Sequence, residues 1–157
     1  MKSFLALVLC CIFPVALIAS DSQPSFKVKY DGGSLPNAKA GSSVSVYIDA
    51  NFVRIAQGQT EIANIPSSSI TEVSYGQDVH RRVGAAIGLA VVSLGIGALM
   101  ALTKSKKHYV GLTWADKDKK GGFAMQCDKN DYRGVIAALE GVSGKKAVNS
   151  DAMTVKN

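Results

Sequence analysis

The chain contains few of the residues that usually carry catalysis or hold metal ions. It has three cysteines and two histidines among 157 residues. Cys10 and Cys11 lie in an apolar N-terminal segment, so the rest of the chain has Cys127 as its sole cysteine and forms no disulfide within itself. The Cys-x-x-Cys and His-x-x-x-His spacings that are typical of zinc sites do not occur. We therefore expect no metal ion and no cofactor.

The remaining side chains suggest no catalytic group either. A thiol nucleophile needs a lowered pKa and a nearby base. Cys127 instead alternates with Phe123 and Met125, which is typical of a small hydrophobic residue facing a core. Asp128 and Asp131 lie close together in the sequence, but helix capping explains them more simply than acid–base chemistry. We predict a protein that is not an enzyme and identify no small-molecule substrate.

Charge is scarce and unevenly placed. Charged residues make up 19% of the chain, against about a quarter in ordinary soluble domains. The segment from Arg81 to Lys120 has eight basic and two acidic residues, an excess equal to the whole net charge of +6. A nucleic-acid-binding protein usually shows a basic stripe with interleaved aromatic residues instead. The distribution favours anionic membrane lipid as a partner and argues against nucleic acid.

The basic excess surrounds an uncharged segment, Val83 to Thr103, which we call the apolar run. Its 21 residues would form a helix about 31 Å long, and the hydrocarbon core of a bilayer is about 30 Å thick. The run is therefore a candidate membrane segment. Five basic residues flank it and are candidate contacts for anionic headgroups: Arg81, Arg82, Lys104, Lys106 and Lys107.

Small residues recur along the apolar run and leave three interpretations open. A GxxxG pair is followed by further small residues, a pattern that allows close helix packing. The run is a single membrane helix that self-associates into an oligomer or pore, a hairpin that turns at its central glycines and dips into one leaflet, or an insert packed on the protein's own body. The small residues concerned are Gly84, Gly88, Ser93, Gly95, Gly97 and Ala101.

The N-terminus indicates export. Lys2 precedes an apolar segment from Phe4 to Ile18, and small residues follow it. This is the pattern of a secretory signal peptide, which we assign to residues 1–20, with an uncleaved anchor as the alternative. We expect the protein on the outer side of the cell membrane, within the cell envelope, or secreted.

Alternating hydrophobic residues predict a mainly antiparallel β domain over residues 43–146. Residues 21–42 form a linker with a candidate first strand at Phe26–Tyr30, and residues 147–157 form a flexible tail. Asp116–Gly122 is expected to be a hairpin loop. An amphipathic helix is expected to start near Asp128 or Asn130, to carry an apolar face from Tyr132 to Val142, and to end at Gly141 and Gly144. The other expected strands are Val44–Ile48, Phe52–Ala56, Thr60–Ile65, Ile70–Tyr75, His108–Trp114 and Phe123–Cys127.

One segment carries a family resemblance. The stretch EIANIPSSSITEVSYG, from Glu61 to Gly76, has an Ile-Pro pair followed by Ile70 and Val73. It resembles bacterial pleckstrin-homology-like (GRAM-like) domains, and FAMQCDKNDYRGVIAALEG is similar to the end of that fold. The resemblance covers about residues 42–144 apart from the apolar run. It implies an α+β fold, a curved sheet or barrel with one C-terminal helix, and a membrane-linked binding or scaffolding role. The inserted apolar run and the export signal argue against a cytosolic phosphoinositide-type role.

The apolar run and the single domain constrain one another. If the run crossed a bilayer once, the strands before and after it would lie on opposite sides and could not share a sheet. A single domain therefore favours a hairpin, an interfacial segment or a peripheral insert. We predict a non-enzymatic, membrane-associated binding or scaffolding module of the cell envelope. The alternatives are an oligomer or pore built on the small-residue face, and a soluble exported binding protein with a packed insert.

Overall fold

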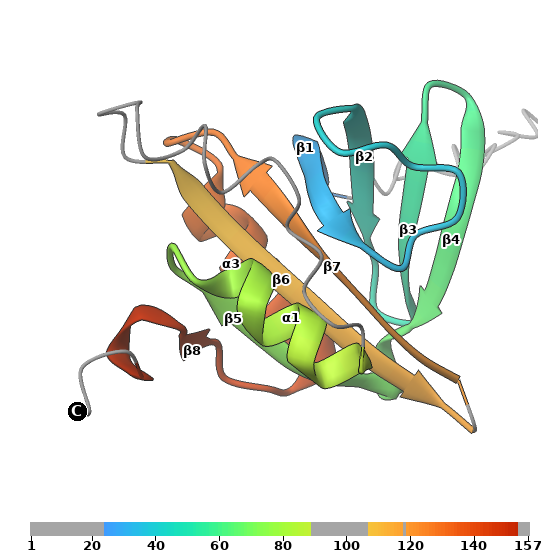
Figure 1. Ribbon diagram of the computed structural model, residues 1–157. Coiled ribbons are helices and arrows are strands. Elements are labelled where there is room, and N and C mark those ends of the chain that lie inside the picture. The colour runs from blue at the N-terminus through green and yellow to red at the C-terminus, as the bar shows by residue number, and fades with distance from the viewer. Residues whose placement is uncertain (1–23, 89–106, 118, 154–157) are drawn as a thin grey trace, which may run out of the picture.

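The computed structural model describes residues 24–88, 107–117 and 119–153. Eight strands form one sheet in the order β4-β3-β2-β1-β7-β6-β5-β8, which Figure 1 shows as a strongly twisted layer. All pairings are antiparallel except the short parallel contact of β5 with β8. The strands are β1 (Ser25–Gly33), β2 (Ser43–Ile48), β3 (Phe52–Gln57), β4 (Thr60–Pro66), β5 (Ile70–Tyr75), β6 (His108–Asp116), β7 (Lys119–Cys127) and β8 (Val148–Asn149).

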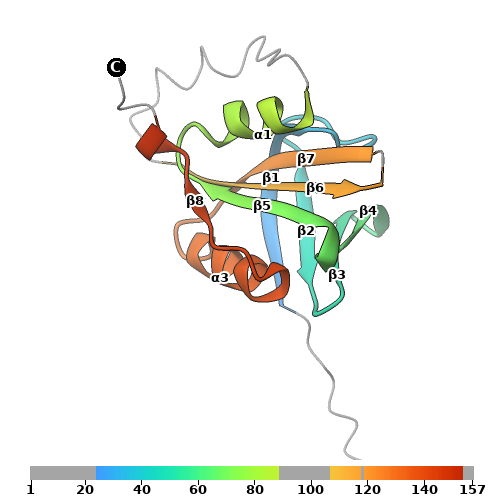
Figure 2. The same ribbon diagram turned by 90° about the horizontal axis from the view of Figure 1, so that it is seen from below.

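Two α-helices lie on opposite faces of the sheet, as Figure 2 shows. They are α1 (Val79–Ile87) and α3 (Tyr132–Ser143). Two short 3-10 turns, η1 (Ser67–Ser69) and η2 (Asp151–Met153), complete the described elements. The α+β class with a mainly antiparallel sheet is confirmed. The helices described here do not have the length and hydropathy of a membrane span.

The main core lies between the sheet and α3. Every second residue of β2, from Val44 to Ile48, is at most 2% exposed, as the period-two pattern predicts. Val135 and Leu139 sit one helical turn apart on α3 and are fully buried against this face. Gly144 ends the helix in a left-handed conformation, with φ at 66°. The predicted C-terminal helix is confirmed, and Gly144 ends it as expected.

A second, smaller core lies under α1 on the opposite face. Val79 and Val83 of α1 are buried against Tyr109 of β6 and Ala124 of β7. The helix approaches β6 closely because Gly111 has no side chain. A Cβ atom at Gly111 would lie 2.6 Å from Val79 Cγ1 and 2.8 Å from Val83 Cγ2. Both faces of the central strands are therefore covered, which explains why β6 and β7 are buried almost continuously.

Three boundaries differ from the expectation. The first strand is longer, Ser25–Gly33. The expected hairpin is present, but its loop is shorter than Asp116–Gly122, because β6 runs to Asp116 and β7 begins at Lys119, directly opposite it. The glycines of the expected loop lie in β7, where they allow close packing and do not form a turn. A Cβ atom at Gly121 would lie 2.2 Å from the ring of Trp114.

The expected flexible tail is also partly wrong. Val148 and Asn149 extend the sheet as β8, lying opposite Ser74 and Tyr75 of β5. Ser150 then fixes the segment, because its backbone N–H and its hydroxyl both donate to the Tyr75 carbonyl.

Candidate functional site

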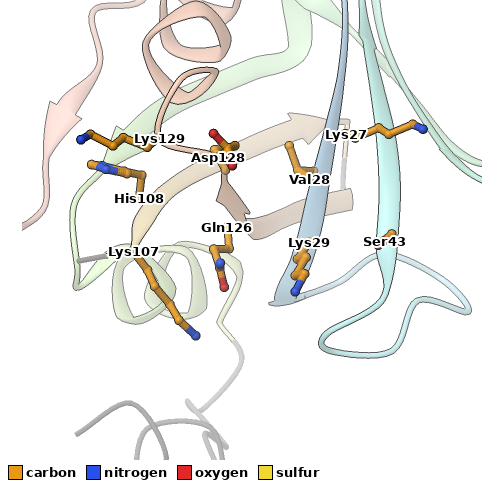
Figure 3. Close-up of a pocket in the computed structure, with 10 residues that line it drawn as sticks. Lys27, Val28, Lys29, Ser43, Lys107, His108, Gln126, Asp128 and Lys129 are labelled. Carbon is orange, nitrogen blue, oxygen red and sulfur yellow. The ribbon is translucent and has the colours of Figure 1, made fainter. Parts of the chain in front are cut away.

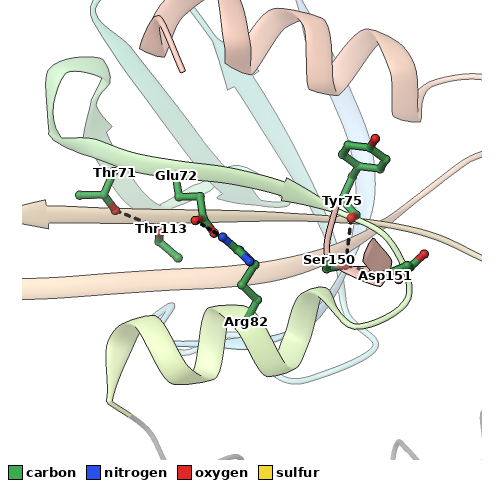
Figure 4. A network of polar contacts seen from close by, with 7 residues as sticks. All are labelled: Thr71, Glu72, Tyr75, Arg82, Thr113, Ser150 and Asp151. Carbon is green, nitrogen blue, oxygen red and sulfur yellow. Dashed lines mark hydrogen bonds and ion pairs between the residues drawn. The ribbon is translucent and has the colours of Figure 1, made fainter. Parts of the chain in front are cut away.

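The two ends of the apolar run belong to one sheet. β5 precedes the run and β6 follows it, and the two strands pair with Val73 opposite Leu112 and Ser74 opposite Gly111. Thr71 Oγ1 and Thr113 Oγ1 also share a hydrogen bond of 2.9 Å across this pair (Figure 4). A single passage through a bilayer would separate these strands. The interpretation of Val83–Thr103 as one membrane-crossing helix is therefore wrong for the folded chain.

The first residues of the apolar run pack on the protein's own sheet. Val83 is 2% exposed and Ile87 is half-buried, both as part of α1. Gly88 ends that helix with φ at 69°, so Gly84 and Gly88 do not form a pair within a continuous helix. The described part of the run thus follows the packed-insert interpretation. Ser93, Gly95, Gly97 and Ala101 lie outside the described residues, as does the expected signal peptide.

The basic flanks of the apolar run have different environments. Arg81 is exposed. Arg82 is paired, with Nε 2.5 Å from Glu72 Oε1 and Nη2 2.6 Å from Glu72 Oε2, a bidentate contact that Figure 4 shows between α1 and β5. This hydrogen bond raises the pKa of Arg82 further above its ordinary value. Arg82 therefore ties α1 to the sheet and is a poorer headgroup contact than predicted. Lys104 and Lys106 lie outside the described residues.

Lys107, where the chain re-enters the sheet, lies near a cluster of titratable groups beneath α1. His80 Nδ1 is 3.9 Å from Asp31 Oδ2, and the His80 and Tyr109 rings meet edge to face at 6.4 Å. Burial raises the pKa of Asp31, and the neighbouring His80 and Lys107 side chains partly oppose the rise. Burial also raises the pKa of Tyr109 to about 12, with the negative charge of Asp31 adding to the effect.

Lys107 also borders a pocket where two strands separate. β1 pairs with β2 along Ser25–Lys29 but with β7 only from Lys29 onward, where Lys29 lies opposite Gln126. Beyond that point β7 pairs with β6 alone, Cys127 lying opposite His108. The opening between the diverging strands is a pocket of about 440 Å³, which we call the wedge (Figure 3).

Four of the ten residues that line the wedge are lysines. They come from β1, from the segment that leads into β6, and from the turn that follows β7. One acidic residue, Asp128, accompanies them, and its carboxylate accepts a hydrogen bond of 3.0 Å from the Asn130 backbone N–H. The His108 ring forms one wall and stacks on Tyr132 of α3 with centroids 4.1 Å apart. The four basic residues are Lys27, Lys29, Lys107 and Lys129.

The chain matches no model of a known protein family. It also has no significant match among curated proteins.

The described residues contain no cluster of three or more potential metal ligands among histidine, cysteine, aspartate and glutamate. Cys127 is buried, and burial raises the pKa of its thiol to about 12, with the negative charge of Asp131 adding to the rise. At neutral pH it is therefore a thiol and a poor nucleophile.

Lys107 was a predicted headgroup contact, whereas the wedge was not predicted from the sequence. Lys27, Lys29 and Lys129 lie far from Lys107 in the sequence, and the separation of β1 from β7 brings them to one opening. The alternation of Lys27 and Lys29 with Val28 was the available signal. It places two cations on the same side of one strand.

Proposed function

We propose that this protein is a non-enzymatic, exported module that binds at an anionic membrane surface, with its folded sheet held on one side of that membrane. The observation that carries the proposal is the pairing of β5 with β6, because the apolar run between them has to leave and re-enter the same sheet. A hairpin or an interfacial anchor meets this condition, because it starts and ends on the same side of the membrane.

The charge distribution supports an anionic surface as the partner. Arg81 at one end of the run is exposed, and Lys107 at the other end is half-buried with its side chain lining the wedge. Lys104 and Lys106 add two charges in the sequence. A basic residue near an anionic membrane contributes about 1 kcal/mol to binding. Arg82 contributes less, because Glu72 already neutralises it.

A packed insert in a soluble binding protein is the second candidate. The observation that favours it is the burial of Val83 and the half-burial of Ile87 in the small core beneath α1. These residues cannot enter a bilayer while they cover β6 and β7. The two candidates therefore differ in what the later part of the apolar run contacts.

Flotation of the full chain with lipid vesicles distinguishes these candidates. We expect binding to phosphatidylglycerol vesicles that weakens with salt, and weaker binding to phosphatidylcholine vesicles. Replacing Arg81, Lys104, Lys106 and Lys107 by glutamine should lower the partition coefficient by about two to three orders of magnitude. The matched control replaces Lys39, Arg133, Lys145 and Lys146, which are exposed and lie outside the basic segment from Arg81 to Lys120. If the chain bound neither phosphatidylglycerol nor phosphatidylcholine vesicles, this result would contradict the membrane proposal and favour the packed insert.

A further inference from the structure

The wedge has more positive charge than its own carboxylates can balance. Four lysines and one aspartate line it. The ion pairs found in the described part of the chain involve Arg54, His80, Arg82 and Lys146, and none of the four wedge lysines. The negative charge of Asp31 does act on Lys107, but from beyond ion-pair distance. An opening with a net charge of this sign raises the local concentration of anions.

The backbone adds hydrogen-bonding groups to the opening. The Tyr30 N–H donates to Ser42, the Tyr30 carbonyl accepts from Gly41, and the Pro24 carbonyl accepts from Ile48. Even-numbered residues of β1 therefore direct their backbone groups toward the β2 side. Lys27 is an odd-numbered residue, so its N–H and carbonyl point away from β2 and toward the wedge, where β7 has already diverged from β1. No strand of the described residues pairs with this edge of β1 before Lys29, and backbone groups there need water or a ligand.

Three polar side chains extend to the same side of this opening. Figure 3 shows Lys29, Gln126 and Lys107 directed toward the face of the sheet that carries α1. Lys29 and Gln126 lie opposite each other in the β1–β7 register, and Gln126 also lies opposite Tyr109 of β6. In this view the Gln126 amide lies between the ammonium group of Lys29, from β1, and that of Lys107, from the segment that leads into β6. In the same view Lys27 and Lys129 extend outward at the two flanks.

This combination suits a phosphate group. Lysine acts as a point charge with three donors and is a common ligand of phosphate, whereas planar carboxylates are bound best by arginine. A pocket of about 440 Å³ also leaves room for a group esterified to the phosphate.

We propose that the wedge binds a phosphate group, with Lys29 and Lys107 as its direct ligands and the Gln126 amide as a further donor. Lys27 and Lys129 strengthen the field at the opening. The phosphate belongs either to a lipid headgroup or to a soluble phosphate compound. The lipid source depends on the proposed membrane function, whereas phosphate binding itself does not. Because Lys107 borders both the apolar run and the wedge, a headgroup would reach this site next to the membrane.

The test is an NMR titration of the full chain with inorganic phosphate at constant ionic strength. We expect saturable shifts of the Lys29, Lys107 and Gln126 amides. The K29Q/K107Q variant should bind phosphate about tenfold more weakly or worse, because two charged hydrogen bonds are lost. The matched control, K119Q/K120Q, removes two exposed lysines of β7 outside the wedge and should bind as the unmodified chain does. The proposal would be overturned if phosphate caused equal amide shifts in K29Q/K107Q and K119Q/K120Q. Shifts that never saturate as phosphate is added would also overturn it.

Two further arms separate the phosphate sources and the partner classes. If phosphate saturates the wedge and phosphatidylglycerol vesicles compete with it, the wedge is a phosphate site and its ligand is a lipid headgroup. If phosphate saturates the wedge but vesicles do not bind, the site stands with a soluble source and the membrane function fails. If vesicles bind and K29Q/K107Q leaves the phosphate shifts unchanged, the wedge site fails while the membrane function stands. A triglutamate peptide that displaces phosphate at equal charge concentration would also overturn the proposal, because the site would then accept any polyanion.

The same spectra show whether each variant folds. Gly111 and Ala124 lie under α1, outside the lining of the wedge. Their amide shifts should stay unchanged in both lysine variants. A folded K29Q/K107Q variant that retains full phosphate affinity would contradict the assignment of these two ligands.

Discussion

Arg82 on α1 holds Glu72 on β5 through two hydrogen bonds, with Nε to Oε1 at 2.5 Å and Nη2 to Oε2 at 2.6 Å. The contact joins the helix that begins the apolar run to the strand that precedes it. Each side chain is less than a third exposed. Together with the Val79 and Val83 contacts, the pair fixes α1 on the face of the sheet opposite α3.

A double-mutant cycle on this pair should give a coupling free energy of about 1 kcal/mol, the upper end for ion pairs near a surface. The substitutions are Arg82→Met and Glu72→Gln, and the measurement is the free energy of unfolding in urea. The internal control is Arg54 with Glu61, whose charged atoms are 3.9 Å apart and whose side chains are 40% and 49% exposed. That pair should couple by roughly 0.3 kcal/mol or less. Equal coupling energies for the two pairs would contradict the structural role of Arg82.

Gly111→Ala should destabilise the protein by roughly 1–3 kcal/mol, because the new methyl group would overlap the valine side chains of α1. Val79→Ala alone should cost about 2 kcal/mol, since it removes two buried methylene equivalents. The double variant should cost less than the sum of the two, because the smaller residue 79 makes room for the new methyl. Additive costs, measured as free energies of unfolding, would show that α1 does not contact β6 at Gly111.

Asp31→Asn should change how stability depends on pH. Folding raises the pKa of Asp31, so the native state binds this proton more tightly than the unfolded chain. The stabilisation from this group is present below the unfolded pKa and is lost as the pH rises through the folded pKa. The unmodified chain should therefore lose stability relative to Asp31→Asn as the pH rises from about 4 to neutrality.

This comparison is best made with His80→Gln in both proteins. The change removes the imidazole, which lowers the Asp31 pKa, so the expected effect grows. Tyr30, Lys107 and Tyr109 remain as the other titratable neighbours of the carboxyl group. Asp116→Asn, at an exposed position, controls for the loss of one negative charge. A stability difference that is independent of pH would contradict the burial of Asp31.

The strands and α3 could be predicted from the sequence because local periodicity determines them. Val44, Val46 and Ile48 alternate with polar residues, and Val135 and Leu139 lie one turn apart. The end of α3 could likewise be predicted from Gly144. These features depend on neighbours in the sequence and on one buried face.

The features that were predicted wrongly or missed depend on contacts between segments distant in the sequence. Gly121 and Gly122 looked like turn residues, but they permit Trp114 and Ile87 to pack closely on β7. Val83 looked like the start of a membrane segment, but it covers Gly111. The wedge arises from the divergence of β1 and β7 after Lys29 and Gln126, and nothing within either strand indicates where the two separate.

The central claim is that the strands before and after the apolar run stay paired while the protein is at a membrane. Thr71 and Thr113 give the most direct test, because their hydroxyl oxygens are 2.9 Å apart across β5 and β6. The T71C/T113C variant of the full chain, with Cys10 and Cys11 replaced by alanine, would be bound to phosphatidylglycerol vesicles and oxidised, and the disulfide scored on a non-reducing gel. The account predicts the same yield of disulfide in the vesicle-bound and unbound fractions. A disulfide that forms in the unbound fraction and not on vesicles would show that the run separates the two halves of the sheet at the membrane, and the account would be wrong.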